Sequence, residues 1–177
     1  PLPFAHEREV GVFWKKTDWT HEEFLYIRGH VPGFSQVALF RQRDVIVRAG
    51  DGPARLVRAV SASAELFDVL GVRTFLGRGL GTGDDVPQAE PVAVLSFGLW
   101  QEMGGNPSIV GTRMTLDGTR RTVIGVLPRG FWFPDPAVRI WIPEALTPES
   151  RNFNSTLVGR VAPNYDVRAM EAPAAQL

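Results

Sequence analysis

The sequence of 177 residues contains no cysteine, which excludes a disulfide scaffold, thiol catalysis and thiolate metal sites. It also carries no net charge, because 19 Lys and Arg residues balance 19 Asp and Glu residues. A large phosphate-binding face, and nucleic-acid binding with it, is therefore not expected. No apolar run approaches the roughly 18 residues of a membrane-spanning helix, and no signal-peptide pattern is present. We therefore expect the chain as given to be soluble.

The composition nevertheless supports a hydrophobic core. Hydrophobic residues make up 44% of the chain and charged residues 21%, as in a globular domain rather than a disordered segment. The length suits one ordinary domain or two small subdomains. No internal repeat or low-complexity segment is present, so the pattern of apolar residues should reveal the helices and strands.

The clearest helix start lies near residue 20. Thr20 and Glu23 have the spacing of a capping box, in which each side chain accepts a hydrogen bond from the backbone N–H of the other residue. Trp19 and Phe24 are placed to form the hydrophobic staple that accompanies such a cap. The pattern predicts a helix that ends near 29–33, because a proline in that segment cannot continue it.

The remaining elements follow from alternation, β-branched residues and turn signals. Gly71 stands where a helix C-terminal glycine belongs, and Ser61 or Ser63 is expected to cap the helix before it. The Asp117–Gly118 pair is a hairpin signal, and Asp166 is expected to cap a final helix. The expected strands cover 10–14, 34–48, 55–62, 91–95, 113–116, 122–126, 140–142 and 156–161, and the other expected helices cover 63–70 and 96–103.

Ser96 lies between a strand-like run and a helix-like run, so it is a candidate nucleophile. A serine nucleophile elbow needs glycines two residues to either side, with a histidine and an acid within reach. Val94 occupies the preceding position instead of glycine. The histidines lie in the lead-in or on the polar side of the first helix; they are His6, His21 and His30. We therefore favour the alternative, in which Ser96 caps a helix that buries Leu99, Trp100 and Met103.

The glycine-rich segment GRGLGTGDDVPQ, residues 77–88, holds further candidates. It lacks the Walker and G-x-G-x-x-G spacings, so a surface loop is favoured over a phosphate-binding loop. Asp84 and Asp85 could contribute to a metal or acid–base site, but adjacent loop residues more often point apart and face solvent. Arg78 is expected to pair with a nearby carboxylate. No catalytic, cofactor or metal site is therefore predicted.

Five arginines lie on two neighbouring predicted strands. They could form a basic face for a lipid head group or an acidic partner, although a solvated sheet face is the simpler interpretation. These residues are Arg41, Arg43, Arg48, Arg55 and Arg58.

Four segments occur together in a fixed order and carry a resemblance to a known family. They are SAELFDVLGVRTFLGRGL, PVAVLSFGLWQEMGGNPSIVGTRMTLDG, RTVIGVLPRGFWFPDPAVRIWIP and LVGRVAPNYDVRAMEA. In this order and spacing the chain resembles the extracytoplasmic core domain of MacB-like ABC transporter permeases, especially the large permeases of the bacterial orphan type. The resemblance covers nearly the whole chain and is strongest over 61–143.

The resemblance implies an α+β fold of two subdomains. A porter-like βα-sandwich would be built from both chain ends, 1–71 and 147–177, with a small α/β subdomain, 72–146, inserted between them. It also implies that the chain is a fragment between two membrane helices, so the Val10 and Met170 regions should lie at the same end of the molecule. The stretch 91–143 then forms the core of the inserted subdomain, and any functional surface should lie on loops, first of all 77–88.

The function that the resemblance implies is that of the periplasmic, extracytoplasmic domain of an inner-membrane permease. Such a domain would bind a partner or cargo and transmit conformational change to the membrane helices of the permease. Its partners would be those helices, a cytoplasmic ATPase through them, and a periplasmic adaptor; the isolated domain should be a monomer without enzymatic activity or cofactor. The alternatives are a hydrolase that uses Ser96 or the Asp84–Asp85 pair, and a stand-alone lipid- or carbohydrate-binding module.

Overall fold

The computed structural model describes residues 10–13, 19–28, 34–48, 50, 52–150 and 154–161. The predicted helix cap Asp166, and Met170, lie outside the described residues. The elements in chain order are β1 (Val10–Phe13), α1 (His21–Ile27), β2 (Phe34–Arg48), β3 (Arg55–Ala62), α2 (Leu66–Leu70), β4 (Leu76–Gly77), β5 (Val92–Leu95), α3 (Phe97–Glu102), a 3-10 helix η2 (Pro107–Ile109), β6 (Arg113–Leu116), β7 (Thr119–Val126), β8 (Val138–Pro143) and β9 (Thr156–Val161). The fold is mixed α/β, with mostly strands and few helices, as predicted.

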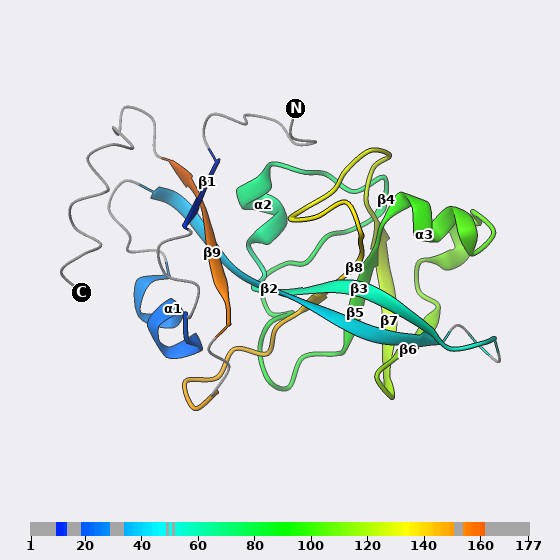
Figure 1. Cartoon of the computed structure of the whole chain (residues 1–177), viewed down its shortest axis with the longest axis horizontal. Helices are drawn as coiled ribbons and strands as arrows, with labels where there is room; N and C mark the ends of the chain where they lie inside the picture. Colours follow the sequence, from blue (N-terminus) through cyan, green and yellow to red (C-terminus); the bar gives the residue numbers. More distant parts are fainter. Residues whose placement is uncertain are drawn as a thin grey trace.

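The strands of the described residues join into one nine-stranded sheet (Figure 1). Its order is β1-β9-β2-β3-β8-β5-β7-β4, and β6 pairs with both β7 and β2. This double pairing of β6 closes a ring, because β2, β3, β8, β5, β7 and β6 are each hydrogen-bonded to the next and β6 returns to β2. These six strands therefore form a small closed barrel.

The interior of the barrel is filled by side chains, as expected for a barrel of few strands. Every barrel strand contributes buried apolar residues to one cluster, and α3 adds Leu99 and Trp100 to it. The barrel residues of this cluster are Val45, Val47, Ala59, Ala93, Leu95, Met114, Leu116, Val123, Val126, Ile140 and Ile142. Because α3 follows β5 directly, it lies at the end of the barrel where β5 and the parallel β7 finish (Figure 1).

The 15-residue strand β2 connects this barrel to the rest of the molecule. Its first half pairs with β9, which also pairs with β1, and its second half pairs with β3 and β6. Alternation along β2 places Val37 and Leu39 against Phe24 of α1, and Ala38 and Phe40 in the cluster formed with α2. One strand thus carries two helices on opposite faces before it enters the barrel.

The helix start predicted near residue 20 is confirmed. Thr20 Oγ1 accepts a hydrogen bond from Glu23 N at 3.1 Å, and Glu23 Oε2 accepts one from Thr20 N at 3.0 Å. Trp19 packs against the cluster that contains Phe24, in agreement with the predicted staple. The two reciprocal bonds satisfy backbone N–H groups that an uncapped first turn would leave unpaired.

The predicted cap of the second helix was wrong. The helix α2 begins at Leu66, with Glu65 as N-cap and no side-chain capping bond. Ser61 lies inside β3, opposite Arg41, and Ser63 Oγ accepts a hydrogen bond from Leu39 N at 3.0 Å instead. The hydroxyl of Ser63 therefore accepts a hydrogen bond from a buried strand amide 24 positions away. Capping rules consider only neighbouring residues, so they could not predict this bond.

The predicted hairpin and C-terminal glycine are both confirmed. Asp117 and Gly118 join β6 to β7 with φ of 47° and 80°, and such positive angles at both central residues are typical of a type I′ hairpin turn. Gly71 ends α2 in the left-handed region, with φ of 64°. The hairpin fixes the register in which Leu116 faces Thr119, so it also sets which residues of β6 reach β2.

Two predictions about the arrangement of the chain, the common location of its two end regions and its division into two subdomains, are not decided by the described residues. In β1 and β9, Val10 lies opposite Arg160, so the first and last described strands share one edge of the sheet. The sheet continues across the predicted boundaries after 71 and before 147, because β8 pairs with β3 over five registered positions. The division into two subdomains stays a prediction.

Candidate functional site

Ser96 is the N-cap of α3 in the structure. Its Oγ accepts a hydrogen bond from Leu99 N at 3.1 Å, and Arg139 Nε lies 3.4 Å from the same oxygen. Among the described residues these are the partners of the Ser96 hydroxyl, and neither of them can act as a general base. The geometry is that of a helix cap, in line with the favoured interpretation of the sequence.

Replacement of Ser96 by alanine is expected to lower the free energy of unfolding by about 1 kcal/mol, because α3 loses its capping acceptor. Ser96→Asn is the matched control, since asparagine caps a helix about as well as serine. Urea unfolding followed by tryptophan fluorescence measures both variants. Equal stability of Ser96→Ala and the unaltered chain would contradict the assignment of Ser96 as a cap.

The adjacent aspartates of the glycine-rich loop have different surroundings. Asp84 accepts hydrogen bonds from Arg78 at 2.6 and 3.0 Å, which raise the pKa of Arg78 above its ordinary value and confirm the predicted pairing. Asp85 is only 2% exposed, and its Oδ2 accepts from Ala64 N and from Arg28 Nη2, each at 2.9 Å. The prediction that both face solvent was therefore wrong, because the Asp84 side chain is only 12% exposed and the Asp85 carboxylate anchors the loop to the end of α1 and the start of α2.

His21 is buried, although the sequence placed it on the polar side of the first helix. It is 1% exposed, and its Nδ1 accepts a hydrogen bond from Thr147 N at 3.3 Å. Its Nε2 lies 3.4 Å from Oε1 of Glu144, which is itself 7% exposed. The ring therefore sits between α1 and the segment after β8, far from Ser96 in the fold, and the earlier placement was wrong.

The five predicted arginines do lie on adjacent strands, but they do not form one face. Arg41 and Arg43 share the alternation of the buried Val45 and Val47, so they point toward the interior side of the barrel wall. The other three are exposed; they are Arg48, Arg55 and Arg58. Period-two alternation places Arg48 and Arg58 on the outside of the barrel, whereas Arg55 lies opposite Val47 and shares the inward alternation at the exposed end of the β2–β3 hairpin.

Arg41 and Arg43 lie at the end of the barrel opposite α3, where β2 enters the barrel, β7 begins and β8 finishes. We call this end the barrel mouth and define it by Arg41, Arg43, Asp117, Arg121 and Glu144. Arg41 binds Glu144 through two bonds of 3.0 and 3.2 Å, and Arg43 Nη2 donates to Asp117 Oδ2 at 2.6 Å. Three guanidinium groups therefore meet two carboxylates, which leaves one positive charge.

Arg121 is the member of the barrel mouth without a carboxylate partner among the described residues. It faces Met114 across the β6–β7 pair, and Met114 belongs to the barrel core, so Arg121 points inward. Its Nη1 donates a long bond of 3.4 Å to Val92 O, and its buried Nε has no acceptor among the residues that the structure describes. Burial lowers the pKa of Arg121 from its ordinary value, and the like charge of Arg43 lowers this pKa further.

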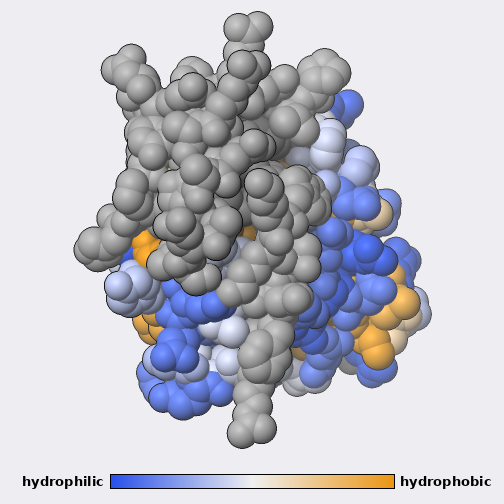
Figure 2. Space-filling view, turned by 60° about the vertical axis from the view of Figure 1, so that its left-hand side comes forward, coloured by the Kyte–Doolittle hydropathy of each residue, from blue (hydrophilic) through white to orange (hydrophobic). Residues whose placement is uncertain are grey.

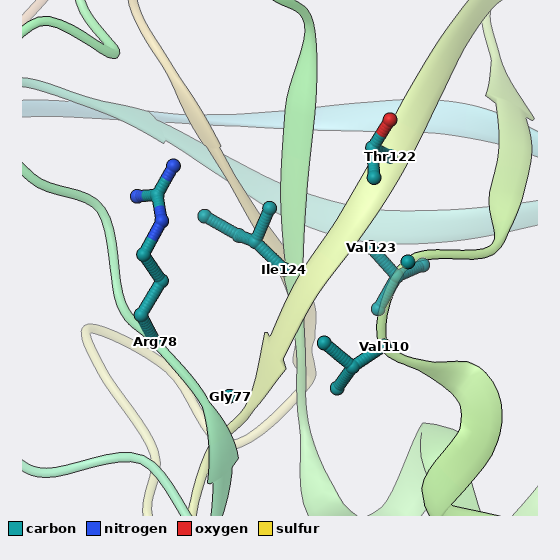
Figure 3. Close-up of a pocket in the computed structure, with 7 residues that line it drawn as sticks. Gly77, Arg78, Val110, Thr122, Val123 and Ile124 are labelled. Atoms are coloured by element: carbon teal, nitrogen blue, oxygen red, sulfur yellow. The ribbon is translucent and has the colours of Figure 1, made fainter.

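A groove of about 380 Å³ lies at the edge of β7, between β4 and the segment that precedes β6. Its walls are largely aliphatic, and Figure 3 shows Val123 and Ile124 on β7, Val110 on the segment before β6, and the Arg78 side chain on the other side of β7. At one side β4 approaches β7 so closely that a Cβ on Gly125 would lie 2.2 Å from Arg78 O. The groove is open to solvent and has no convergent set of polar groups among its lining residues, unlike a typical small-molecule site.

The visible described surface is mostly hydrophilic, with orange hydrophobic areas that are separated from one another (Figure 2). Within the described ranges, no group of three or more His, Asp or Glu side chains is arranged to hold a metal ion. No helix of the described residues has the length and hydropathy needed to cross a bilayer. The barrel mouth brings five charged side chains together, of which Glu144 is buried and Arg41, Arg43 and Arg121 are half-buried.

Comparisons with known proteins agree on one family and one fold. A family model described as the MacB-like periplasmic core domain matches residues 4–177. The periplasmic region of MacB from Actinobacillus actinomycetemcomitans is similar in structure, with a TM-score of 0.68, 17% identity, and coverage of 87% of this chain and 70% of that one. No curated protein matches the sequence.

Two further solved structures share the fold at similar levels. A domain assigned to a permease of Porphyromonas gingivalis has a TM-score of 0.67 and 15% identity, with coverage of 94% of this chain and 81% of that one. The extracellular domain of the noncanonic ABC-type transporter YknZ from Gram-positive bacteria has a TM-score of 0.66 and 16% identity, with coverage of 88% and 78%. At these identities the likeness is one of fold.

Proposed function

The chain belongs to the family of MacB-like periplasmic core domains, and from this premise we propose that it binds a partner or cargo outside the membrane and transmits conformational change to membrane helices. Domains of this family are the extracytoplasmic regions of ABC transporter permeases, which work with an ATPase. The proposal places this chain in such a permease. An adaptor protein as the partner, and a monomeric state of the isolated domain, remain predictions.

The observation that carries the proposal is the path of the sheet. Val10 in β1 and Arg160 in β9 lie opposite each other, so the described chain enters and leaves along one edge. From that edge β2 runs without interruption into the barrel. Backbone hydrogen bonds therefore join the edge to the barrel, and a displacement of the edge should move the barrel as one body.

The alternative functions have less support. Ser96 is occupied as a helix cap, and Asp85 is occupied by Arg28 and the backbone of Ala64, so a hydrolase would need other residues. The groove beside β7 is open and largely aliphatic, whereas a lipid- or carbohydrate-binding module would be expected to enclose its ligand. An interaction surface that does not enclose its ligand agrees better with docking of a partner.

Fluorescence energy transfer in the reconstituted permease with its ATPase tests this proposal. The chain lacks cysteine, so Leu56→Cys supplies one labelling site in the barrel; Leu56 is 72% exposed. With an acceptor on the lipid head groups, ATP is expected to change the transfer efficiency from this site, because the barrel moves relative to the membrane. The nucleotide-free permease is the reference state.

A second labelled pair, Tyr26→Cys with Leu56→Cys, is the internal control. Tyr26 of α1 is 82% exposed, and the distance between the two labels should stay constant if the domain moves as one body. A barrel that keeps its position relative to the membrane in the presence and absence of ATP would contradict transmission. A change confined to the internal pair would contradict motion as one body.

A further inference from the structure

The charge balance of the barrel mouth has a specific consequence for Arg121. Arg41 is engaged by both oxygens of Glu144, and Arg43 donates to Asp117 through Nη2. Within the part of the chain that the structure describes, Arg121 has only the long contact to Val92 O, and its buried Nε has no acceptor. A buried polar group without a hydrogen-bond partner is costly, and an acceptor oxygen that met the guanidinium group of Arg121 after a small rotation of its side chain would remove this cost.

We propose that the barrel mouth binds a carboxylate group of a ligand, held by Arg121 and Arg43. The guanidinium fork presents parallel N–H donors that match the two oxygens of a carboxylate. The barrel wall fixes the fork, because Arg121 lies on β7 between its pairings to β5 and β6. The site does not depend on the function proposed above, and its test uses the 177-residue chain alone.

The charges of the barrel mouth favour a carboxylate over a phosphate. Three guanidinium groups and two carboxylates leave a single positive charge, which one carboxylate neutralises. A phosphate dianion would leave an excess of negative charge beside Glu144 and Asp117. Burial and the charge of Arg43 lower the pKa of Arg121, and the charges of Asp117 and Glu144 offset part of this effect; a bound anion would favour the charged form of Arg121 further.

Nuclear magnetic resonance of the Arg121 Nε–H group tests the site directly. Acetate is expected to shift this signal in a saturable manner, while sodium chloride at the same ionic strength is not. A short peptide with a free C-terminal carboxylate, compared with the same peptide amidated, tells whether a chain terminus can supply the group. Saturation by acetate but not by either peptide would assign the site to small carboxylic acids.

Two variants on β7 separate the site from general surface charge. Arg121→Lys keeps the charge but removes the fork, so the affinity for acetate is expected to fall roughly tenfold or more. Arg120→Gln removes a charge from the neighbouring exposed residue, which alternation directs to the outside of the barrel, and should change the affinity by less than about twofold.

Several results would overturn the proposal. An equal response to chloride would reduce the effect to screening, and unaltered affinity in Arg121→Lys would remove the fork from the site. Tighter binding of inorganic phosphate than of acetate would exclude the carboxylate assignment. Should Arg121→Lys fail to fold, the titration of the unaltered chain, read at the Arg121 Nε–H signal, still decides between a saturable site and none.

Discussion

Replacement of Trp141 by alanine is expected to lower the free energy of unfolding by about 3–5 kcal/mol. Trp141 is fully buried in β8 and belongs to the cluster that joins α2 to the sheet. Its ring centroid lies 5.6 Å from that of Phe131 and 6.3 Å from that of Phe67, and its Nε1 donates to Phe133 O at 3.2 Å. Alanine would leave a large cavity and remove the hydrogen bond to Phe133 O at once.

Trp141→Phe separates these two losses. It keeps an aromatic ring in the cluster and removes the indole N–H, so it should cost clearly less than Trp141→Ala. Urea denaturation monitored by circular dichroism gives both free energies with the same probe. A cost for Trp141→Ala no larger than about 1 kcal/mol would show that the site collapses around the cavity and would contradict the role of Trp141 as the centre of the cluster.

Replacement of Glu144 by alanine is the second large effect, also expected at about 3–5 kcal/mol. Glu144 binds Arg41 through both of its oxygens, and the two side chains are 9% and 18% exposed. Removal of the carboxylate leaves the Arg41 charge largely buried without its partner. His21 Nε2, at 3.4 Å from Glu144 Oε1, would lose its nearest anionic neighbour as well.

The double variant Arg41→Met with Glu144→Leu is the informative comparison. It removes both charges and fills the space with apolar atoms, so it should be more stable than Glu144→Ala alone, since an unpartnered buried charge costs more than the absence of the pair. Denaturant unfolding of the unaltered chain, Glu144→Ala and the double variant measures this difference. A double variant less stable than Glu144→Ala would show that the pair contributes beyond satisfying its own burial.

Sequence patterns predicted those elements whose signals are local. The Thr20 and Glu23 capping box, the Asp117–Gly118 turn and the cap at Ser96 all depend on residues within three positions of each other, and all three are confirmed. Resemblance of four ordered segments was also enough for the family. Local rules sufficed here because the hydrogen bonds that stabilise these features form within a single turn.

The features that sequence patterns missed depend on partners far along the chain. Asp85 reads as an exposed loop residue, and only the fold brings it to Arg28, which is 57 positions away. His21 meets the backbone of Thr147 across 126 positions. The pairing of β6 with β2, which closes the barrel, could not be predicted for the same reason, because the sequence of neither strand indicates the other as its partner. Arg121 could have been suspected from its place beside inward-facing apolar residues on an alternating strand.

The closed barrel has a consequence for the order in which the chain can fold. In the sheet, β3 receives its parallel neighbour β8 only from residues 138–143, after β4, β5, β6 and β7 have been made. A chain delivered from its N-terminus therefore holds a paired β2–β3 hairpin with an open edge until most of the domain has emerged. Pairing between segments so far apart in the sequence gives a high contact order, which predicts slow folding. Until β8 is available, the unpaired edge of β3 is the place where a strand of a neighbouring chain could pair incorrectly.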